Sequence, residues 1–228
     1  MKSKKQNSES LVDVRNRLAK PSMLKDLSDN DMVVSNGPLN TVVTDLITDS
    51  RRVTPGSAFF AIPGQRTDGN NYLEEAISRG AKTIISNQKN EDLPLGVASI
   101  QTNDPRLALA KFAKKHNGSP DKSLNIIGVT GTNGKTSLAT ILSHVANNLD
   151  LPSVALGNIG HPLSSAEASG KTIGKNIFLE ASSFQACQST VLRLDSLLWT
   201  NFSPDHLDYH LSEREYFLAK LKLANRCK

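Results

Sequence analysis

Short apolar runs alternate with helical patterns along the second half of the chain. Four such runs predict buried strands, at residues 125–130, 153–156, 176–180 and 196–200. Helical patterns occupy residues 137–148 and 212–225. Strands that are apolar on both faces and alternate with helices indicate an α/β fold whose parallel sheet is covered on both sides.

The first half has shorter runs of the same kind. Residues 41–48, 58–62, 83–86 and 97–102 are predicted as strands, and residues 71–79 as a helix. Another helix is expected to start at Asp104-Pro105, an N-cap residue followed by proline at the first helical position. A polar stretch at residues 117–121 separates the halves. We therefore expect a flexible basic tail (1–30), an N-terminal α/β domain (31–118) and a second domain (121–228).

The composition favours a cytoplasmic protein. With 38% hydrophobic residues the chain can bury a core, yet no apolar run approaches the roughly 18 residues that span a bilayer. The polar, basic start is not a secretory signal, so no membrane insertion is expected. Cys187 and Cys227 are not spaced as metal ligands or as a disulfide framework, which is typical of a reducing compartment.

The net charge of +5 belongs to the N-terminus. Residues 1–25 hold seven Lys/Arg against two Asp/Glu, and the remainder carries equal numbers of both signs. A nucleic-acid-binding surface would need basic residues and aromatics clustered in the folded part, and no such cluster is present in the sequence. No nucleic-acid partner is therefore expected.

A glycine-rich segment after the strand at 125–130 predicts a phosphate loop. Residues 131–136 read Gly-Thr-Asn-Gly-Lys-Thr and open a helix, although Val129 stands where the general P-loop pattern has glycine. In such a loop the backbone N–H groups and the helix N-terminus face the phosphates, the lysine reaches the outer phosphates and the threonine can ligate Mg²⁺. The candidate ATP-binding residues are Gly131, Thr132, Asn133, Gly134, Lys135, Thr136 and Ser137.

Polar segments at other strand ends should join this loop. Residues 157–160, 180–185 and 201–206 follow predicted strands, and parallel sheets bind ligands at their carboxyl ends. Glu180 is a candidate Mg²⁺ ligand, or else a carboxylate that caps the next turn. His206 and His210 have a spacing that suits zinc, but a third ligand is missing from the pattern. His206 better fits a ligand of a second divalent ion.

Several motifs together resemble the Mur ligase family, the ATP-dependent enzymes that build the peptide stem of the peptidoglycan precursor. They are the loop at 131–136, Gly-Asn-Ile-Gly at 157–160, Glu-Ala-Ser-Ser-Phe-Gln at 180–185, Pro-Asp-His-Leu-Asp-Tyr-His at 204–210 and Ala-Lys at 219–220. Asp-Ser-Arg at 49–51 and the glycines at 56, 64 and 69 resemble the family's UDP-binding domain. The resemblance implies a small UDP-binding domain followed by a P-loop central domain that is incomplete at its C-terminus, with no C-terminal domain.

The resemblance also implies roles for individual residues. Lys135, Glu180, His206 and Lys220 would be catalytic. Thr136 and Glu180 would hold one Mg²⁺, and His206 would help to hold a second. Lys220, 14 residues after His206, would carry a carbamate formed from CO₂ that serves as a metal ligand; the alternative is an ordinary surface lysine. The implied substrate-binding residues are Ser50, Arg51, Gly64, Asp68, Asn158, Ser182 and Gln185.

The implied activity is ATP-dependent amide formation through an acyl phosphate. The N-terminal half resembles either the branch that adds diaminopimelate or lysine to UDP-N-acetylmuramoyl-L-alanyl-D-glutamate or the branch that adds the terminal dipeptide. Asp-His-Leu-Asp-Tyr-His also suits the diaminopimelate- or lysine-adding branch, which we favour. Gly-Asn-Ile-Gly and Ser-Ser-Phe-Gln instead resemble the D-glutamate-adding branch. The diaminopimelate- or lysine-adding branch typically has His-Ala in place of Phe184-Gln185 and an arginine soon after, whereas residue 190 here is threonine. A non-catalytic ATP- or UDP-precursor-binding fragment and a folylpolyglutamate-type ligase are further alternatives. We expect a monomer whose partners are the UDP precursor, ATP and an amino acid, and which turns over poorly without a C-terminal domain.

Overall fold

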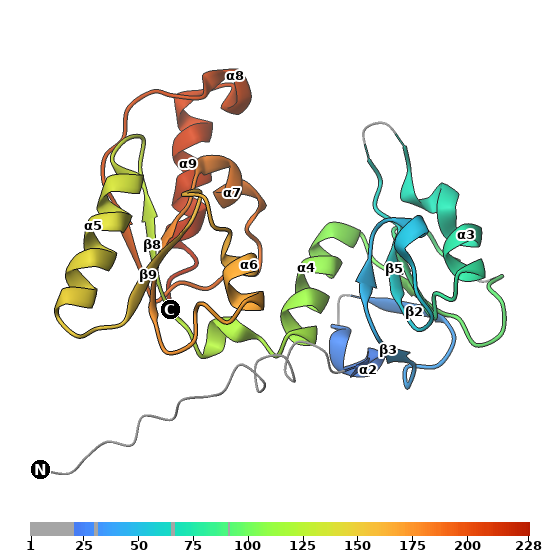
Figure 1. The fold of residues 1–228 in the computed structure, drawn as a ribbon. Coiled ribbons are helices and arrows are strands. Elements are labelled where there is room, and N and C mark those ends of the chain that lie inside the picture. The colour runs from blue at the N-terminus through green and yellow to red at the C-terminus, as the bar shows by residue number, and fades with distance from the viewer. Residues whose placement is uncertain (1–20, 30–31, 65–66, 91) are drawn as a thin grey trace, which may run out of the picture. The chain divides into compact units, whose positions relative to one another are not determined.

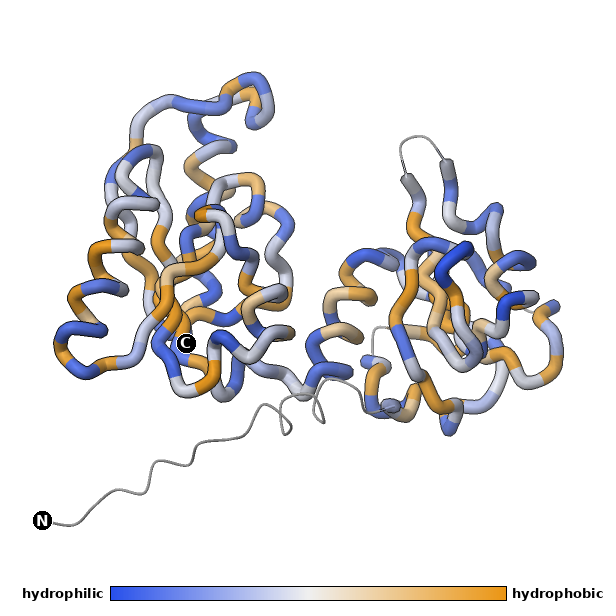
Figure 2. Tube along the Cα trace, in the orientation of Figure 1, coloured by the Kyte–Doolittle hydropathy of each residue, from blue (hydrophilic) through white to orange (hydrophobic). Residues whose placement is uncertain are grey.

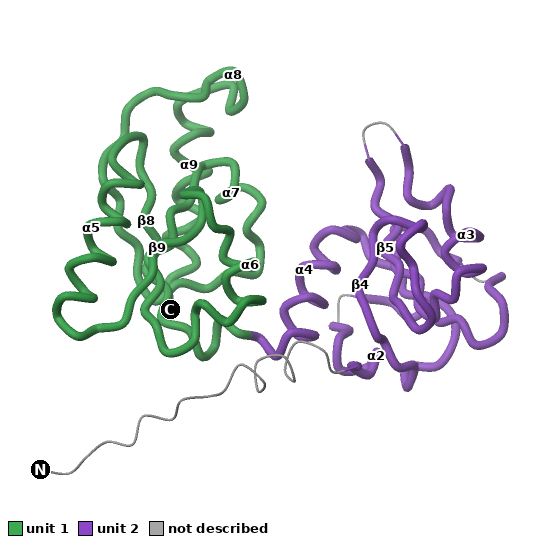
Figure 3. Tube along the Cα trace, in the orientation of Figure 1, with its two compact units in different colours: residues 1–15, 120–228 green, residues 16–119 purple. Residues whose placement is uncertain are grey.

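The computed structural model describes residues 21–29, 32–64, 67–90 and 92–228. These residues form two compact units, and the chain passes from one to the other between Ser119 and Pro120 (Figure 3). Most of the predicted tail, residues 1–20, lies outside the described part.

Residues 120–228 form an α/β unit with one four-stranded sheet. Its strands are β8 (Asn125–Thr130), β9 (Ser153–Gly157), β10 (Asn176–Glu180) and β11 (Ser196–Trp199). Its helices are η3 (Pro120–Lys122), α5 (Lys135–Asn148), α6 (Leu163–Ala168), α7 (Ser183–Gln188), α8 (Leu207–His210) and α9 (Glu213–Ala224). All three strand pairings are parallel, in the order β11-β8-β10-β9. Helix α5 lies on one side of the sheet, and α7 and α9 lie on the other (Figure 1). The predicted covered parallel sheet is confirmed.

The register aligns the carboxyl ends of these strands. Glu180, the last residue of β10, pairs with Val129 of β8 and with Gly157 of β9. Trp199, the last residue of β11, pairs with Thr130. Strand β8 lies between β10 and β11, so the loop that follows it is flanked by the ends of both neighbours.

An apolar core holds the sheet to its helices. Ile126, Leu156 and Ile177 come from three strands and are at most 1% exposed, and Leu223 of α9 packs with them. Figure 2 shows the hydrophobic colouring that runs along these strands. The strand ends are thus fixed by a core that leaves their carboxyl edge for polar groups.

Residues 21–119 form the second unit, built on a mixed five-stranded sheet. Its strands are β1 (Ser22–Met23), β2 (Val33–Asn36), β3 (Val42–Val43), β4 (Leu46–Ile47), β5 (Ala58–Phe60), β6 (Thr83–Ser86) and β7 (Ala98–Gln101). Its helices are α2 (Leu24–Leu27), η1 (Ser50–Arg52), η2 (Gly69–Tyr72), α3 (Leu73–Ser78) and α4 (Pro105–His116). The order is β2-β7-β6-β5-β4, with only β2 antiparallel, and β1 pairs separately with β3. Asp104 caps α4 as predicted, accepting bonds from Arg106 and Leu107 N–H.

Three sequence-based expectations need correction here. The single strand predicted at 41–48 is two strands, because the chain leaves β1 after Val43 and pairs with β5 from Leu46. The helix predicted at 71–79 begins as the 3₁₀ turn η2, which Asp68 caps. The predicted flexible tail reaches too far, since Leu24 and Leu27 of α2 are buried in the core of this unit.

Among the helices that the structure describes, none is both long and apolar enough to cross a lipid bilayer.

Candidate functional site

The loop after β8 depends on its glycines. Gly131 has φ 144°, and a Cβ there would lie 2.0 Å from Thr200 Oγ1, so no side chain fits. Gly134 has φ 79°, the left-handed region, and immediately precedes α5. The loop therefore turns tightly into a helix N-terminus, where peptide dipoles favour a phosphate.

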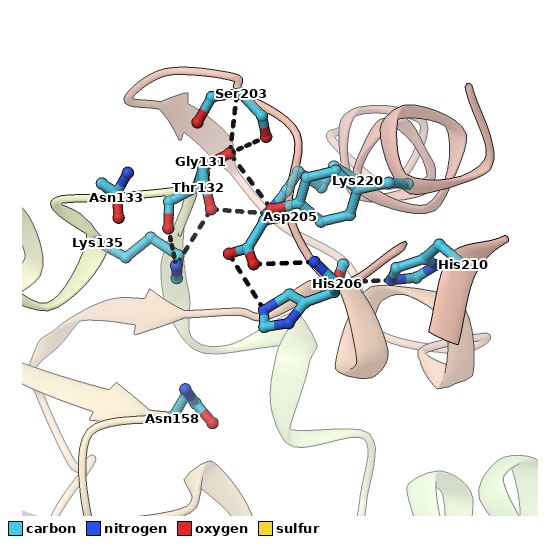
Figure 4. A network of polar contacts seen from close by, with 12 residues as sticks. Gly131, Thr132, Asn133, Lys135, Asn158, Ser203, Asp205, His206, His210 and Lys220 are labelled. Carbon is cyan, nitrogen blue, oxygen red and sulfur yellow. Dashed lines mark hydrogen bonds and ion pairs between the residues drawn. The ribbon is translucent and has the colours of Figure 1, made fainter. Parts of the chain in front are cut away.

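Lys135 lies back across this loop. Its Nζ donates to the carbonyl oxygens of Thr132 at 2.8 Å and Gly131 at 3.1 Å (Figure 4). These bonds hold an ammonium group at the mouth of the loop. A bound triphosphate would find that charge already in place.

The segment after β11 fixes the other side of the loop. Asn201 accepts from Thr132 N–H through its carbonyl oxygen at 3.2 Å and from Asn133 N–H through Oδ1 at 2.9 Å. Thr200 Oγ1 donates to the Asn133 carbonyl at 2.7 Å. The expected convergence of residues 131–136 and 201–206 is confirmed. Asn201 was expected here only as part of the segment 201–206, and Thr200 was not among the predicted site residues, because no sequence pattern distinguishes it from other strand-end polar residues.

Glu180 joins three strand ends. Its Oε2 accepts from Thr136 Oγ1 at 2.7 Å, and its Oε1 accepts from Asn158 Nδ2 at 3.3 Å. The carboxylate is 2% exposed and does not cap the next helix, which Ser182 caps instead, so the capping interpretation is wrong. A hydroxyl and a carboxylate oxygen side by side at a phosphate loop fit Mg²⁺, which takes few protein ligands and completes its shell with water and phosphate.

Lys220 is buried, not a surface lysine. It is 1% exposed, and its Nζ donates to the Gly131 carbonyl at 2.7 Å. Burial, reinforced by the nearby charge of Lys135, lowers the pKa of Lys220 to about 8. The two lysines therefore approach the same turn of the loop from α5 and α9 (Figure 4).

His206 and His210 have different surroundings. His206 has a left-handed backbone (φ 53°), and its Nε2 lies 3.5 Å from Asp205 Oδ2 (Figure 4). His210 is 4% exposed and bonds to Ser183 Oγ at 2.9 Å, and burial together with the charge of His206 lowers its pKa. In the described part of the chain no three His, Cys, Asp or Glu side chains gather as a metal site. The pair thus lacks the donor set that zinc requires.

Ser182 and Gln185 form a capping box at the start of α7. Gln185 N–H donates to Ser182 Oγ at 3.2 Å, and Ser182 N–H donates to Gln185 Oε1 at 3.0 Å. Both residues are predicted substrate contacts. Their side chains also satisfy the free N–H groups of the helix, as a capping box does.

The candidate residues of the other unit follow strands β4 and β5. Ser50 is buried and donates to Glu75 Oε2 at 2.5 Å, while the exposed Arg51 forms a two-point ion pair with Asp49 at 2.8 and 2.9 Å. The hydrogen bond from Arg51 lowers the pKa of Asp49 to about 2. The remaining two, Gly64 and Asp68, belong to the turn after β5, where Gly64 N–H donates to the Thr67 carbonyl and Asp68 accepts from Asn70 N–H.

Two family descriptions match the chain. Residues 129–228 match the Mur ligase middle domain, and residues 42–117 match the Mur ligase family catalytic domain. The chain belongs to the Mur ligase family. These ranges contain the phosphate loop, Glu180, His206 and Lys220 on one side and Ser50 to Asp68 on the other.

Relatives of this chain include UDP-N-acetylmuramoyl-L-alanyl-D-glutamate–2,6-diaminopimelate ligases from several bacteria. The one from Phocaeicola vulgatus is 31% identical over 87% of this chain, and the one from Bacteroides fragilis is 34% identical over 79%. This chain spans less than half of them, 44% and 41% of their lengths. A solved structure of a UDP-N-acetylmuramoyl-L-alanyl-D-glutamate–2,6-diaminopimelate ligase superposes with a TM-score of 0.68 at 22% identity, covering 91% of this chain and 45% of that one. The fold is therefore that of the Mur ligases.

Proposed function

We propose that this chain forms the UDP-precursor-binding and ATP-binding parts of an ATP-dependent ligase of peptidoglycan precursor synthesis. The proposed reaction joins diaminopimelate or lysine to UDP-N-acetylmuramoyl-L-alanyl-D-glutamate. The observation that carries the proposal is the pairing of Thr136 with Glu180 beside the Lys135 loop. The names of the relatives support the choice of substrate.

The chemistry that these residues would assist is phosphoryl transfer followed by acyl transfer. A carboxylate oxygen of the precursor attacks the γ-phosphorus of ATP, ADP leaves, and an acyl phosphate results. The amine of the amino acid then attacks the acyl carbon, loses a proton, and phosphate leaves. Lys135 and the loop N–H groups would hold the phosphates, which offsets the repulsion between two anions. Mg²⁺ held by Thr136 and Glu180 would neutralise phosphate charge.

We propose that Lys220 is carbamylated and that His206 helps to bind a second Mg²⁺. CO₂ adds only to a neutral amine, forming an N–C bond while the nitrogen loses a proton. With a pKa of about 8, roughly a tenth of the Lys220 amine is neutral at pH 7, far more than for an exposed lysine. The carbamate would offer the metal an anionic oxygen.

The remaining assignments complete the proposal. Ser50, Arg51, Gly64 and Asp68 would line the UDP site of an N-terminal domain at 31–118. Asn158, Ser182 and Gln185 would contact the sugar-peptide from a central domain at 121–228. Because both ATP and the UDP precursor are cytoplasmic metabolites, the reaction would take place in the cytoplasm. We propose that the chain acts as a monomer.

A second candidate is the addition of D-glutamate to UDP-N-acetylmuramoyl-L-alanine. It is favoured by Phe184-Gln185 and by Thr190 in place of the arginine expected for the diaminopimelate-adding branch. Gln185 is part of the α7 capping box. The residue that differs from the diaminopimelate-adding branch therefore has a structural role in this chain.

The test is ADP release by the 228-residue chain with Mg²⁺-ATP and bicarbonate. One arm contains UDP-N-acetylmuramoyl-L-alanyl-D-glutamate with diaminopimelate or lysine, and the other UDP-N-acetylmuramoyl-L-alanine with D-glutamate. ADP release in the first arm that requires both substrates and is lost in Lys135→Ala supports the proposal. Release only in the second arm would support the second candidate. Saturable ATP binding without ADP release in either arm would instead make this chain a binding fragment.

A further inference from the structure

Tyr216 has no role in the site described so far, although it reaches the phosphate loop. It lies on α9 one turn before Lys220, is 1% exposed, and its hydroxyl is 3.3 Å from Thr132 Oγ1. Residues four apart lie on the same helix face, so α9 contacts two consecutive loop residues. Tyr216 contacts Thr132, and Lys220 contacts Gly131.

The hydrogen-bond geometry at Thr132 fixes the direction of the Tyr216 bond. Thr132 Oγ1 donates its single proton to the Ser203 carbonyl at 3.0 Å and accepts from Ser203 N–H at 3.0 Å. A hydroxyl has one donor and two acceptor positions, so its remaining position is an acceptor. The Tyr216 hydroxyl is therefore the donor. Thr132 links the phosphate loop, the segment after β11 and α9 through one oxygen atom.

The ring of Tyr216 has further contacts in the same place. Lys220 Nζ lies 4.6 Å from the ring centroid. The ring also packs against Phe202 at 5.4 Å and His210 at 5.3 Å between centroids. The side chain thus contacts the phosphate loop, the segment after β11, helix α8 and Lys220 of its own helix.

We propose that Tyr216 is a positioning residue that holds Thr132 and the 201–206 segment in the conformation that receives the nucleotide phosphates. The hydroxyl fixes the loop, and the ring supports the Lys220 amine. This inference rests on the proposed function, because the loop has a nucleotide to receive only if the chain binds ATP. Loss of the hydroxyl would loosen the loop without moving Lys220.

The test is amide hydrogen exchange of the 228-residue protein without ligand. Tyr216→Phe keeps the ring and removes the hydroxyl. We expect exchange at Thr132, Asn133 and Ser203 to become about fivefold faster, the change in an opening equilibrium that one ordinary hydrogen bond gives. Tyr209→Phe is the matched control, since Tyr209 is 50% exposed and its hydroxyl bonds to no described residue. Unchanged exchange in Tyr216→Phe, or an equal increase in Tyr209→Phe, would overturn the inference.

A second variant separates a specific contact from general loosening. Thr132→Val removes the acceptor, so the double variant Thr132→Val/Tyr216→Phe should exchange no faster at Asn133 than Thr132→Val alone. Additive effects would contradict a direct bond.

Titration with Mg²⁺-ATP then separates failure of the proposed nucleotide site from failure of the proposed role of Tyr216. We expect Tyr216→Phe to bind about fivefold more weakly than the wild type and Tyr209→Phe to bind equally. If Lys135→Ala binds as tightly as the wild type, the proposed nucleotide site fails. If Lys135→Ala alone loses binding and Tyr216→Phe does not differ from the wild type in either experiment, only the role of Tyr216 fails.

Discussion

Glu180 connects three strand ends through a single carboxylate. Thr136 of α5 and Asn158 after β9 each donate a hydrogen bond to one of its two oxygens. The apolar core that includes β10 holds the backbone of Glu180 in place. Glu180 is almost fully buried, and in the described part of the chain its two oxygens accept from neutral groups only; a buried carboxylate is costly unless a cation completes the site. This burial supports the proposed role of Glu180 as a ligand of Mg²⁺.

Glu180→Gln should weaken ATP binding in the presence of Mg²⁺ by about tenfold or more, because an amide offers the ion no negative charge. Without Mg²⁺ the variant and the wild type should bind alike. Fluorescent-nucleotide titration with and without Mg²⁺ measures both. Glu74→Gln, an exposed carboxylate on α3 in the other unit, is the control and should change neither value. Equal Mg²⁺ dependence in Glu180→Gln and wild type would contradict the metal role.

The low pKa of Lys220 predicts a pH dependence of stability. Burial lowers the pKa from 10.5 to about 8, so between these values the unfolded chain binds more protons than the folded one. Stability must then rise with pH in this window, and the penalty from the buried ammonium is full below pH 8. Relative to Lys220→Met, the wild type should gain in Tm between pH 8 and 10. Parallel Tm profiles of the two proteins, measured without bicarbonate, would contradict this.

Sequence reasoning finds some site residues and not others for a physical reason. Lys135 and Glu180 stand at fixed positions relative to a strand end, where parallel topology dictates what they face. Tyr216 instead reaches the loop from within helix α9, and that contact depends on how the helix packs. The spacing of Tyr216 one turn before Lys220 is the one signal that could have identified it.

In the short helix α7 the same residues close the helix N-terminus and are predicted to contact the substrate. It has six residues, and its N-terminus is closed by the reciprocal bonds of Ser182 and Gln185. Ser183 within it bonds to His210, so the helix also orients the segment that carries His206. Any substrate contact by Ser182 would use a side chain that the helix already needs.

Ser182→Ala should lower the free energy of unfolding by about 1 kcal/mol, the usual cost of losing an N-cap. Denaturant unfolding measures this change. Ser164→Ala, at an exposed position of α6, serves as the control and should change stability by less than about 0.5 kcal/mol. A Ser182→Ala protein as stable as the control would show that the capping box contributes nothing.

At the element scale, the sequence predicts the strands whose runs are apolar and uninterrupted. The runs at 83–86, 125–130 and 176–180 match β6, β8 and β10. Strand β2 and helices α2, α6, α7 and α8 were not predicted. They are four to six residues long, too short for a helical or alternating pattern to be distinguished from a loop.

The whole chain contains separate cores for its two units. Phe60 and Phe112 meet edge to face at 5.4 Å in the core of residues 21–119, while Ile126, Leu156 and Ile177 form that of residues 120–228. Each unit therefore has its own source of hydrophobic stabilisation. The sequence predicts the same division into two units, because a polar stretch at 117–121 separates two sets of apolar runs.

Phe112→Ala should destabilise the unit at 21–119 by about 3–5 kcal/mol, as expected for a large core cavity. Hydrogen exchange should show lost protection in β5 and β6 while β8 and β10 remain protected. Leu156→Ala should give the opposite pattern. Equal loss of protection in both units from either variant would contradict separate cores.

Calorimetric titration of the 228-residue protein with Mg²⁺-ATP tests the proposed nucleotide site most directly. We expect one saturable site whose affinity falls at least about tenfold in Lys135→Ala, because the ammonium group at the loop is lost. Lys171→Ala removes an exposed lysine of the same unit and should bind as the wild type does. Absence of saturable binding in the wild type, or equal affinity in Lys135→Ala, would contradict the assignment of residues 131–136 as the site that holds ATP.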